Sequence, residues 1–362
     1  MNDKEKKLAL YYFSKYYSTA NFNIPSMEKR EFGVGFNKKI DSRHLSFENE
    51  IQLKNYLVNS TPFFISYSTA HYDHPAITPI EKKGWKGADL VFDLDVHTEG
   101  KYDAYLKLNS VKEDAIRLSE EFLQQDFGLS EQEITYVFSG NRGYHVHVRS
   151  DEVFSLGAQE RREIVDYIRG VGLDFRSFFY SDDEKKTKLL GPRLDSSGYK
   201  GRFVKKVVDT LEKTPSLIYR GFSDVEKKNN FIEGVKIGNW SRTPFSIEKL
   251  QTKLSVVSKD LPLLSVDADA AVTYDIKKLI RMPNSIHGST GFIAKEIGNI
   301  DSFNPLNDAL PEYEGELKIT FTESVPEIKL NNSTYSFSKG NISTLPTAIA
   351  LFFILKESAS LI

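Results

Sequence analysis

Two aspartates in one short segment are the first candidates for chemistry in this chain. Asp93 and Asp95 lie in ADLVFDLDV, residues 88–96. Alternate side chains of a strand share a face, so both carboxylates are expected on one face. The other face is apolar and is expected to pack into a core: Leu90, Phe92, Leu94 and Val96. Two carboxylates this close raise each other's pKa unless a cation neutralises them, and hard oxygen ligands suit Mg²⁺ or Mn²⁺. A half-solvated strand end, with both aspartates facing water, would have the same pattern.

The turn at 139–143, SGNRG, could bind phosphate. Small residues in a tight turn let backbone N–H groups approach an anion, and Ser139 and Arg142 would add hydroxyl and guanidinium donors. His145 would project from the strand that leaves the turn. Taken alone, this motif is also an ordinary hairpin turn.

A third aspartate, Asp275, precedes Arg281 and His287. The residues between them predict a short helix that Pro283 ends. Metal-assisted nucleotidyl transfer requires carboxylates that hold two metal ions beside groups that bind a triphosphate. These residue types therefore indicate that reaction. A lone histidine is more often structural, and a D-x-D motif also occurs in glycosyltransferases that use nucleotide sugars. The hypothesis of nucleotidyl transfer therefore depends on the order and spacing of three segments: the paired aspartates, the SGNRG turn, and the segment from Asp275 to His287.

The elements that must position these residues alternate between helices and strands. Hydrophobic periodicity predicts helices at 4–18, 48–57, 158–170 and about 346–358, and one from a capping box at Ser110 and Glu113 to Asp126, closed by Gly128. Strands are predicted at 29–34, 41–47, 62–68, 134–138 and 144–149, and again after 315. A basic cluster between 185 and 206 is expected to be solvated unless a polyanion passes nearby.

Composition excludes several classes of protein. The 362 residues are 40% hydrophobic and 27% charged, with a net charge of −2, so any contact with nucleic acid must come from local patches. The chain has no cysteine, which excludes disulfides, thiolate catalysis and cysteine-ligated zinc. The histidines of HYDHP (71–75), with His97, match no zinc spacing and are expected on the surface. No signal peptide or membrane span is evident, so we expect a soluble, cytoplasmic protein.

The sequence resembles the small, catalytic subunit of the archaeal and eukaryotic DNA primases. Three blocks carry the resemblance: ADLVFDLDV (88–96), SGNRGYHVHV (139–148) and VTYDIKKLIRMPNSIHGSTGF (272–292). REFG (30–33), SRHLSF (42–47) and LPTAIALFFIL (345–355) support it. The likeness is weakest across 150–260.

The resemblance implies a role for each matching residue. Asp93, Asp95 and Asp275 correspond to catalytic, metal-binding aspartates. Nucleotide or phosphate contacts are implied for seven further residues: Ser139, Arg142, His145, Arg281, His287, Glu31 and Arg43. The alignment is looser for the last two. Most members of that family carry a cysteine-rich zinc-binding knob soon after the two aspartates. This chain has no cysteine and only a short loop there, so no zinc is expected.

The implied fold is a single mixed α/β (α+β) catalytic domain over 1–362, with mixed sheets flanked by helices and a variable, mostly helical insertion at 150–260. The implied activity is synthesis of short RNA, or also DNA, primers on single-stranded DNA from NTPs or dNTPs, with two Mg²⁺ or Mn²⁺ ions and a large primase subunit as partner. Other hypotheses are a repair or plasmid primase-polymerase that extends existing ends, a structural subunit with a degenerate site, and a D-x-D glycosyltransferase.

Overall fold

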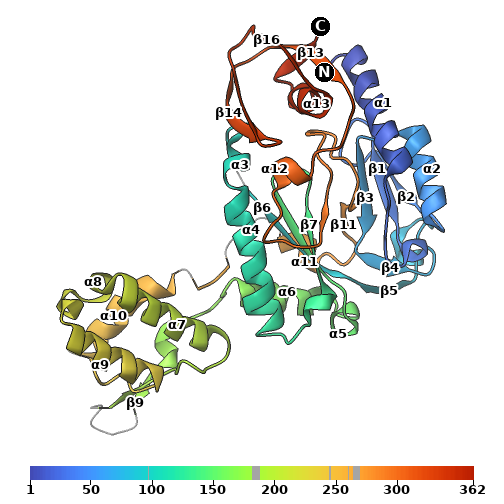
Figure 1. The fold of residues 1–362 in the computed structure, drawn as a ribbon. Helices are drawn as coiled ribbons and strands as arrows, with labels where there is room; N and C mark the ends of the chain where they lie inside the picture. The colour runs from blue at the N-terminus through green and yellow to red at the C-terminus, as the bar shows by residue number, and fades with distance from the viewer. Residues whose placement is uncertain (97, 182–187, 244–245, 260, 264–269) are drawn as a thin grey trace. The chain divides into compact units, whose positions relative to one another are not determined.

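The computed structural model describes residues 1–96, 98–181, 188–243, 246–259, 261–263 and 270–362. The chain forms two compact units. The first comprises Met1–Ile116, Ser130–Val165 and Ser265–Ile362, and the second comprises Arg117–Leu129 and Asp166–Leu264. Figure 1 labels their helices and strands. Three segments distant in sequence thus build the first unit, which contains every candidate site residue.

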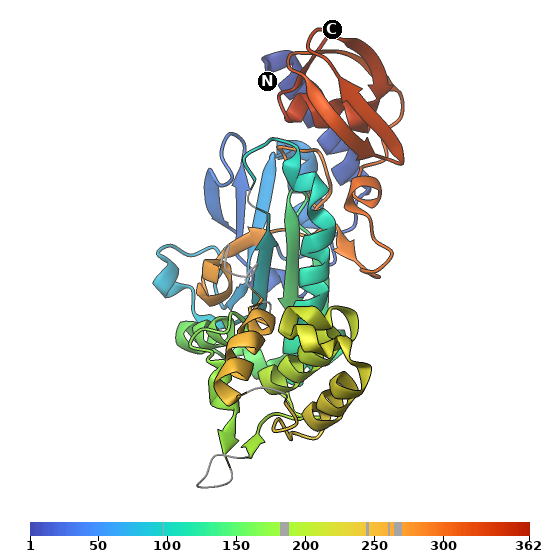
Figure 2. The ribbon, with the colours of Figure 1, turned by 90° about the vertical axis from the view of Figure 1, so that its left-hand side faces the viewer.

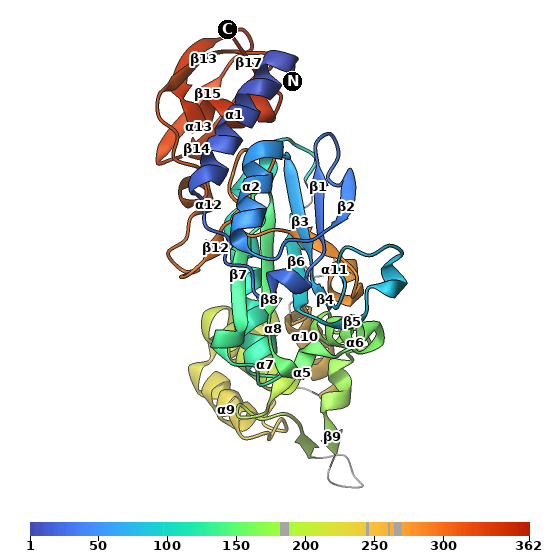
Figure 3. The same cartoon turned by 90° about the vertical axis from the view of Figure 1, so that its right-hand side faces the viewer.

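An antiparallel sheet near the N-terminus has the strand order β11-β3-β1-β2. Its strands are β11 (Leu279–Arg281), β3 (Phe64–Ser68), β1 (Phe32–Gly35) and β2 (Ser42–Leu45). Helices α1 (Asp3–Thr19) and α2 (Glu50–Ser60) pack together beside this sheet (Figure 3). A capping box of Asn2 and Glu5 begins α1, and its buried Phe13 and Tyr17 join Phe32 and Ile65 in one core.

A second antiparallel sheet, of order β12-β7-β8-β6, carries the paired aspartates. Its strands are β12 (Glu296–Ile297), β7 (Ile134–Phe138), β8 (Gly143–Val148) and β6 (Leu90–Asp95). The four residues of the predicted apolar face of β6 are all buried. Burial of each such large side chain contributes about 1.5–3 kcal/mol, which fixes the face on which the aspartates lie. Helix α11 (Ala270–Tyr274) packs against β6.

The C-terminal segment adds strands and one wholly apolar helix. A three-stranded sheet contains β13 (Glu316–Phe321), β16 (Ile342–Pro346) and β17 (Ala359–Leu361), and β14 (Val325–Leu330) pairs with β15 (Ser333–Phe337). Helix α13 (Thr347–Leu355) lies beside these strands (Figure 2). The strands predicted after 315 and the final helix are thus confirmed.

Shorter elements complete the first unit and its borders. They are α3 (Asp103–Leu106), α4 (Leu108–Arg117), α5 (Asp151–Phe154), α6 (Ala158–Ile168), α12 (Pro305–Asp308), β4 (Ala70–Tyr72) and β5 (Trp85–Ala88). Short 3₁₀ turns occur at Met27–Lys29, Ile80–Lys82 and Glu131–Glu133.

The second unit is mostly helical around an aromatic core. Its helices are a π-helix (Leu118–Gln124), α7 (Gly198–Lys213), α8 (Pro215–Ile218), α9 (Val225–Lys236) and α10 (Ile247–Ser258). Short 3₁₀ turns occur at Phe175–Phe178 and Arg220–Ser223. Strands β9 (Tyr180–Ser181) and β10 (Leu189–Leu190) pair as an antiparallel ribbon. The rings of Phe203 and Trp240 stack in this core with centroids 5.9 Å apart.

The expectation of a solvated basic cluster is wrong for Arg202. Its side chain is buried, pairs with Asp126 at 2.7 Å and lies over the rings of Phe122 and Tyr199. Its guanidinium therefore holds α7 to the preceding helical segment of the same unit. Lys185 and Lys186 of that cluster lie outside the described residues.

Two local predictions are corrected by tertiary context. Residues 279–281, predicted as part of a helix, form β11, because hydrogen bonding to β3 overrides their weak helical periodicity. Ser110 does not cap a helix: its hydroxyl donates to the carbonyl of Lys107 inside a helix that begins earlier. The mixed α/β fold class is confirmed. No described helix is long and apolar enough to cross a membrane.

Candidate active site

The pairing of β6 with β8 places both aspartates beside candidate phosphate-binding groups. In the register of this pair, Asp93 lies opposite His145 and Asp95 lies opposite Gly143. Asp93 Oδ1 is 3.6 Å from His145 Nε2. The side chains of Asp93 and Asp95 are 19% and 22% exposed, so solvent or a ligand can reach both. The predicted common face of the two carboxylates is present.

The turn between β7 and β8 brings a guanidinium to the second aspartate. Arg142 Nη2 donates to Asp95 Oδ2 at 2.8 Å, while Ser139 Oγ accepts from the backbone N–H of Gly143 at 3.2 Å. Arg142 Nε is buried and has no hydrogen-bond partner among the described residues. Arg142 thus balances the charge of Asp95 and still has a donor to offer.

A loop after β11 is joined to this turn. Thr290 Oγ1 donates to the carbonyl of Gly140 at 2.6 Å, and Gly140 has a φ of +79°. A Cβ at Gly140 would come within 2.8 Å of His287 Cβ, so a larger residue would push the turn from the loop. His287 is therefore held beside the turn that carries Ser139 and Arg142.

Arg281 and Phe64 form one wall of the site. Arg281 lies on β11, with its guanidinium 5.0 Å from the centre of the Phe64 ring and Nη1 donating to the carbonyl of Ile65. The His287 imidazole makes a T-shaped contact with the same ring, with centroids 5.6 Å apart. Arg281 Nε is buried without a hydrogen-bond partner among the described residues. The wall thus carries another unused N–H donor.

Burial keeps the two imidazoles neutral. Desolvation, followed by the charge of Arg281, lowers the pKa of His145 to about 3. Desolvation and the nearby cations, Arg281 first, hold the pKa of His287 well below its ordinary value. Burial lowers the pKa of Arg281 to about 10, which leaves it charged at neutral pH. Arg281 can therefore supply charge, while each imidazole can supply an uncharged hydrogen bond.

Asp275 follows α11, the helix that packs against β6. Its side chain is exposed, and Oδ1 accepts from the backbone N–H of Lys277 at 3.0 Å. Over the residues that the structure describes, no three acidic or histidine side chains are gathered closely enough to hold a metal ion. The structure thus brings Asp93 and Asp95 together and leaves Asp275 outside a closed three-residue cluster. The oxygen donors and partial exposure of the β6 pair still fit a hard divalent ion.

Glu31 and Arg43 form an ion pair at the edge of the first sheet. Glu31 is fully buried and accepts from Arg43 Nε at 2.8 Å, while Lys83 Nζ lies 3.0 Å from its other oxygen. Burial would raise the pKa of Glu31, but hydrogen bonds and charges from Arg43 and Lys83 hold it below its ordinary value. Arg43 is 38% exposed. Arg43 is therefore the member of the pair that can reach a ligand, and Glu31 fixes its position.

Sequence reasoning missed two supporting groups. Lys83 is buried against Glu31, and nothing in its local pattern indicates this. Asp89, one residue before β6, is buried and pairs with Arg30 Nη2 at 2.7 Å and with Arg149 Nε at 3.3 Å. Arg30 also donates to the carbonyl of Ser68 on β3, so this network ties the two sheets together.

The predicted surface histidines are only partly on the surface. His74 is exposed, but His71 lies on β4 with Nε2 3.2 Å from the buried Asp89. The buried carboxylate of Asp89 is thus the partner of His71. His97 lies outside the described residues.

Comparison with known proteins identifies the family. The family model for the DNA primase small subunit matches residues 92–298. A DNA primase small subunit of Methanocella arvoryzae is 33% identical over 99% of both chains. Those of Thermoplasma volcanium and Archaeoglobus fulgidus are 34% and 33% identical, over 97% and 96% of this chain and 96% of each relative. The chain therefore belongs to the DNA primase small-subunit family.

Membership of this family gives the activity of the chain as that of a primase, which is a nucleotidyltransferase. Within a primase, the small subunit is the catalytic subunit. The matched segment begins on β6 and includes β8, α11 and the loop of His287. These findings do not favour a polymerase that only extends existing ends.

Proposed function

We propose that this chain synthesises short RNA, or also DNA, primers on a single-stranded DNA template from NTPs or dNTPs. The observation that carries the proposal is the register of β6 and β8. It sets two carboxylates beside an imidazole and a guanidinium, with Arg142 bound to Asp95 at 2.8 Å. Nucleotidyl transfer needs acidic groups for cations next to basic groups for a polyphosphate.

Asp93, Asp95 and Asp275 are the proposed ligands of two Mg²⁺ or Mn²⁺ ions. When bound, such ions favour ionisation of the attacking 3′-hydroxyl and neutralise charge on the leaving pyrophosphate. The common face of Asp93 and Asp95 and their partial exposure, 19% and 22%, support this assignment, because they leave oxygen donors within reach of a hard cation. Asp275 is included because it directly follows α11, the helix that packs against the strand of the other two aspartates.

The protein's own residues would bind and orient the triphosphate. Arg142 and Arg281 each have a buried Nε without a partner among the described residues, and such a donor is costly unless a ligand satisfies it. Ser139 would add a hydroxyl, and the neutral His145 and His287 would add hydrogen bonds. Fixed donors of this kind stabilise charge that develops on the phosphates in the transition state.

Arg43 is proposed to line the sugar side of the nucleotide site, with Glu31 behind it as its ion-pair partner. Arg43 is close enough to Asp275 for the two charges to affect each other, which supports a place beside the catalytic acids. Glu31 would act only by holding Arg43, since its carboxylate is buried.

A large primase subunit is the proposed partner, because the relatives are named as small subunits. The net charge of −2 gives the chain little general attraction for DNA. A second subunit that also binds the template DNA would compensate for this weak electrostatic attraction.

Primer synthesis on unprimed single-stranded DNA, with labelled NTPs and Mg²⁺ or Mn²⁺, tests the proposal. We expect metal-dependent products from the wild type and none from Asp95→Asn. Asp301→Asn, at an exposed position outside the site, is the matched control and should retain full activity. Full activity of Asp95→Asn would refute the assignment. Products only when a preformed primer is supplied would refute initiation by this chain alone.

A further inference from the structure

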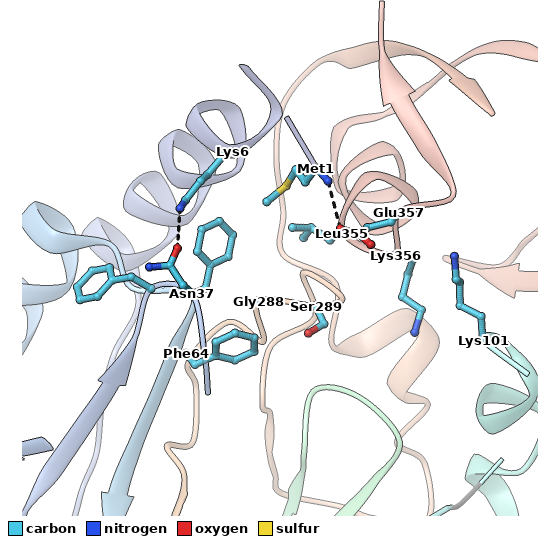
Figure 4. Close-up of a pocket in the computed structure, with 12 residues that line it drawn as sticks. Met1, Lys6, Asn37, Phe64, Lys101, Gly288, Ser289, Leu355, Lys356 and Glu357 are labelled. Atoms are coloured by element: carbon cyan, nitrogen blue, oxygen red, sulfur yellow. Dashed lines mark hydrogen bonds and ion pairs between the residues drawn. The ribbon is translucent and has the colours of Figure 1, made fainter. Parts of the chain in front are cut away.

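A pocket of about 510 Å³ opens beside the loop that carries His287. Figure 4 shows that the N-terminus, the strand β3, the loop after β11 and the end of α13 all contribute to it. Its lining residues are Met1, Lys6, Phe36, Asn37, Phe63, Phe64, Lys101, Gly288, Ser289, Leu355, Lys356 and Glu357. The volume is within the range of small-molecule sites.

The pocket adjoins the proposed triphosphate contacts. Gly288 and Ser289 directly follow His287, and Phe64 is the ring that both His287 and Arg281 contact. A Cβ at Gly288 would come within 2.5 Å of the carbonyl oxygen of Phe63, so the loop and β3 approach each other closely here. Phe64 therefore belongs to the wall of the pocket and to the wall of the active site, and Gly288 and Ser289 continue the loop of His287 into the pocket.

Three of the positive groups that line the pocket already have partners. The N-terminal ammonium of Met1 lies 3.1 Å from a carboxylate oxygen of Glu357, and Lys6 Nζ donates to Asn37 Oδ1 at 3.1 Å (Figure 4). Lys101 Nζ pairs with the carboxylate of Glu323 at 2.5 Å. An added anion would have to compete with these partners.

Lys356 differs from these three cations. It follows α13, is half-buried, and its Nζ lies 5.1 Å from the centre of the Tyr105 ring. No carboxylate in the described part of the chain forms a salt bridge with it. Tyr105 Oη in turn donates to Asn141 Oδ1, in the turn that carries Arg142, at 3.4 Å. Lys356 thus lies beside both segments that are proposed to contact phosphate.

The local electrostatics favour an anion at this position. Burial, then the charges of Lys101 and Arg142, lower the pKa of Lys356 to about 8. A cation that burial and its neighbours destabilise gains more from a bound anion than one that a carboxylate already neutralises.

We propose that Lys356 binds the terminal phosphates of the incoming nucleoside triphosphate and retains the pyrophosphate after transfer. This inference rests on the proposed function and extends its binding site to the end of the C-terminal helix. A DNA backbone is the less suitable occupant, because it follows a row of accessible cations, whereas Lys6 and Lys101 are engaged and Lys356 alone is available in the described lining of this pocket.

Lys356→Met tests the proposal in the full-length protein, with Lys329→Met as a control on the exposed side of β14. Loss of one charge-assisted contact is expected to raise KM for the NTP about tenfold, with kcat at saturating NTP changed less than about twofold. The affinity for pyrophosphate, measured by calorimetry without catalysis, should fall by a similar factor. Lys356→Arg should restore most of both, and Lys329→Met should change neither.

Separate results identify each possible failure. A wild type that makes no primers would refute the proposed function. A wild type that does, with unchanged KM and pyrophosphate affinity in Lys356→Met, would refute only the role of Lys356. Weaker binding of single-stranded DNA by Lys356→Met, with KM for the NTP unchanged, would also overturn it in favour of a template contact. Thermal melting of each variant excludes misfolding as the cause.

Discussion

Replacing Glu31 by glutamine should destabilise the protein strongly, although the residue touches no proposed substrate. The side chains of Glu31 and Lys83 are both 0% exposed, and the carboxylate also accepts from Arg43 Nε at 2.8 Å. Glutamine removes the negative charge and places an amide N–H group against the donors of Arg43 or Lys83, where no hydrogen bond can form. Breaking one partner of a buried ion pair costs about 3–5 kcal/mol. At about 2–4 °C per kcal/mol, the Tm should fall by roughly 6–20 °C.

A double-mutant cycle separates this effect from general damage. Lys83→Met removes the cation that Glu31→Gln would leave buried, so the double variant should be at least about 1 kcal/mol more stable than the sum of the single losses predicts. Urea unfolding of the wild type and the three variants measures the coupling. Additive losses would show that Lys83 does not depend on Glu31 and would refute the argument.

The pH dependence provides an independent check. The folded-state pKa of Glu31 is held below its ordinary value, so its stabilising contribution is complete above the unfolded-state pKa of about 4.3. The contribution is lost as the pH falls through the folded-state pKa. The stability difference between wild type and Glu31→Gln should therefore shrink below about pH 4. A constant difference down to pH 2 would contradict the assigned ion pair.

Three further predictions concern the active site. Asp93→Ala should abolish primer synthesis, by a factor of about 10³ or more, with an unchanged circular dichroism spectrum; a variant with most of its activity would exclude Asp93 as a ligand. Removal of divalent ions with EDTA should stop synthesis without unfolding the chain, and Mg²⁺ or Mn²⁺ should restore it; synthesis that persists in EDTA would refute metal dependence. Because burial, then Arg281, lowers the pKa of His287 below the unfolded value of about 6.5, its contribution to stability is present above that pH and lost as the pH falls. NMR of its ring nitrogens should show a neutral imidazole from pH 6 to 8, and a titration midpoint within that interval would contradict this.

The local pattern of the sequence determined the elements that carry the site. Alternation in ADLVFDLDV predicted the buried face of β6 and the common face of Asp93 and Asp95, because the pleat of a strand alone decides which side chains share a face. The glycines of SGNRG likewise predicted the turn between β7 and β8, since a positive φ is strongly preferred by glycine. The order of the three blocks was sufficient to indicate the primase family.

Only the tertiary structure decided which distant residues meet. Residues 279–281 became a strand because β3 offered hydrogen-bonding partners, which their own periodicity could not reveal. Lys83 and Lys356 show no local pattern that would connect them with Glu31 or with the loop of His287. Their roles arise from charges brought together across the chain, and electrostatic interactions depend on distance and burial rather than on position in the sequence.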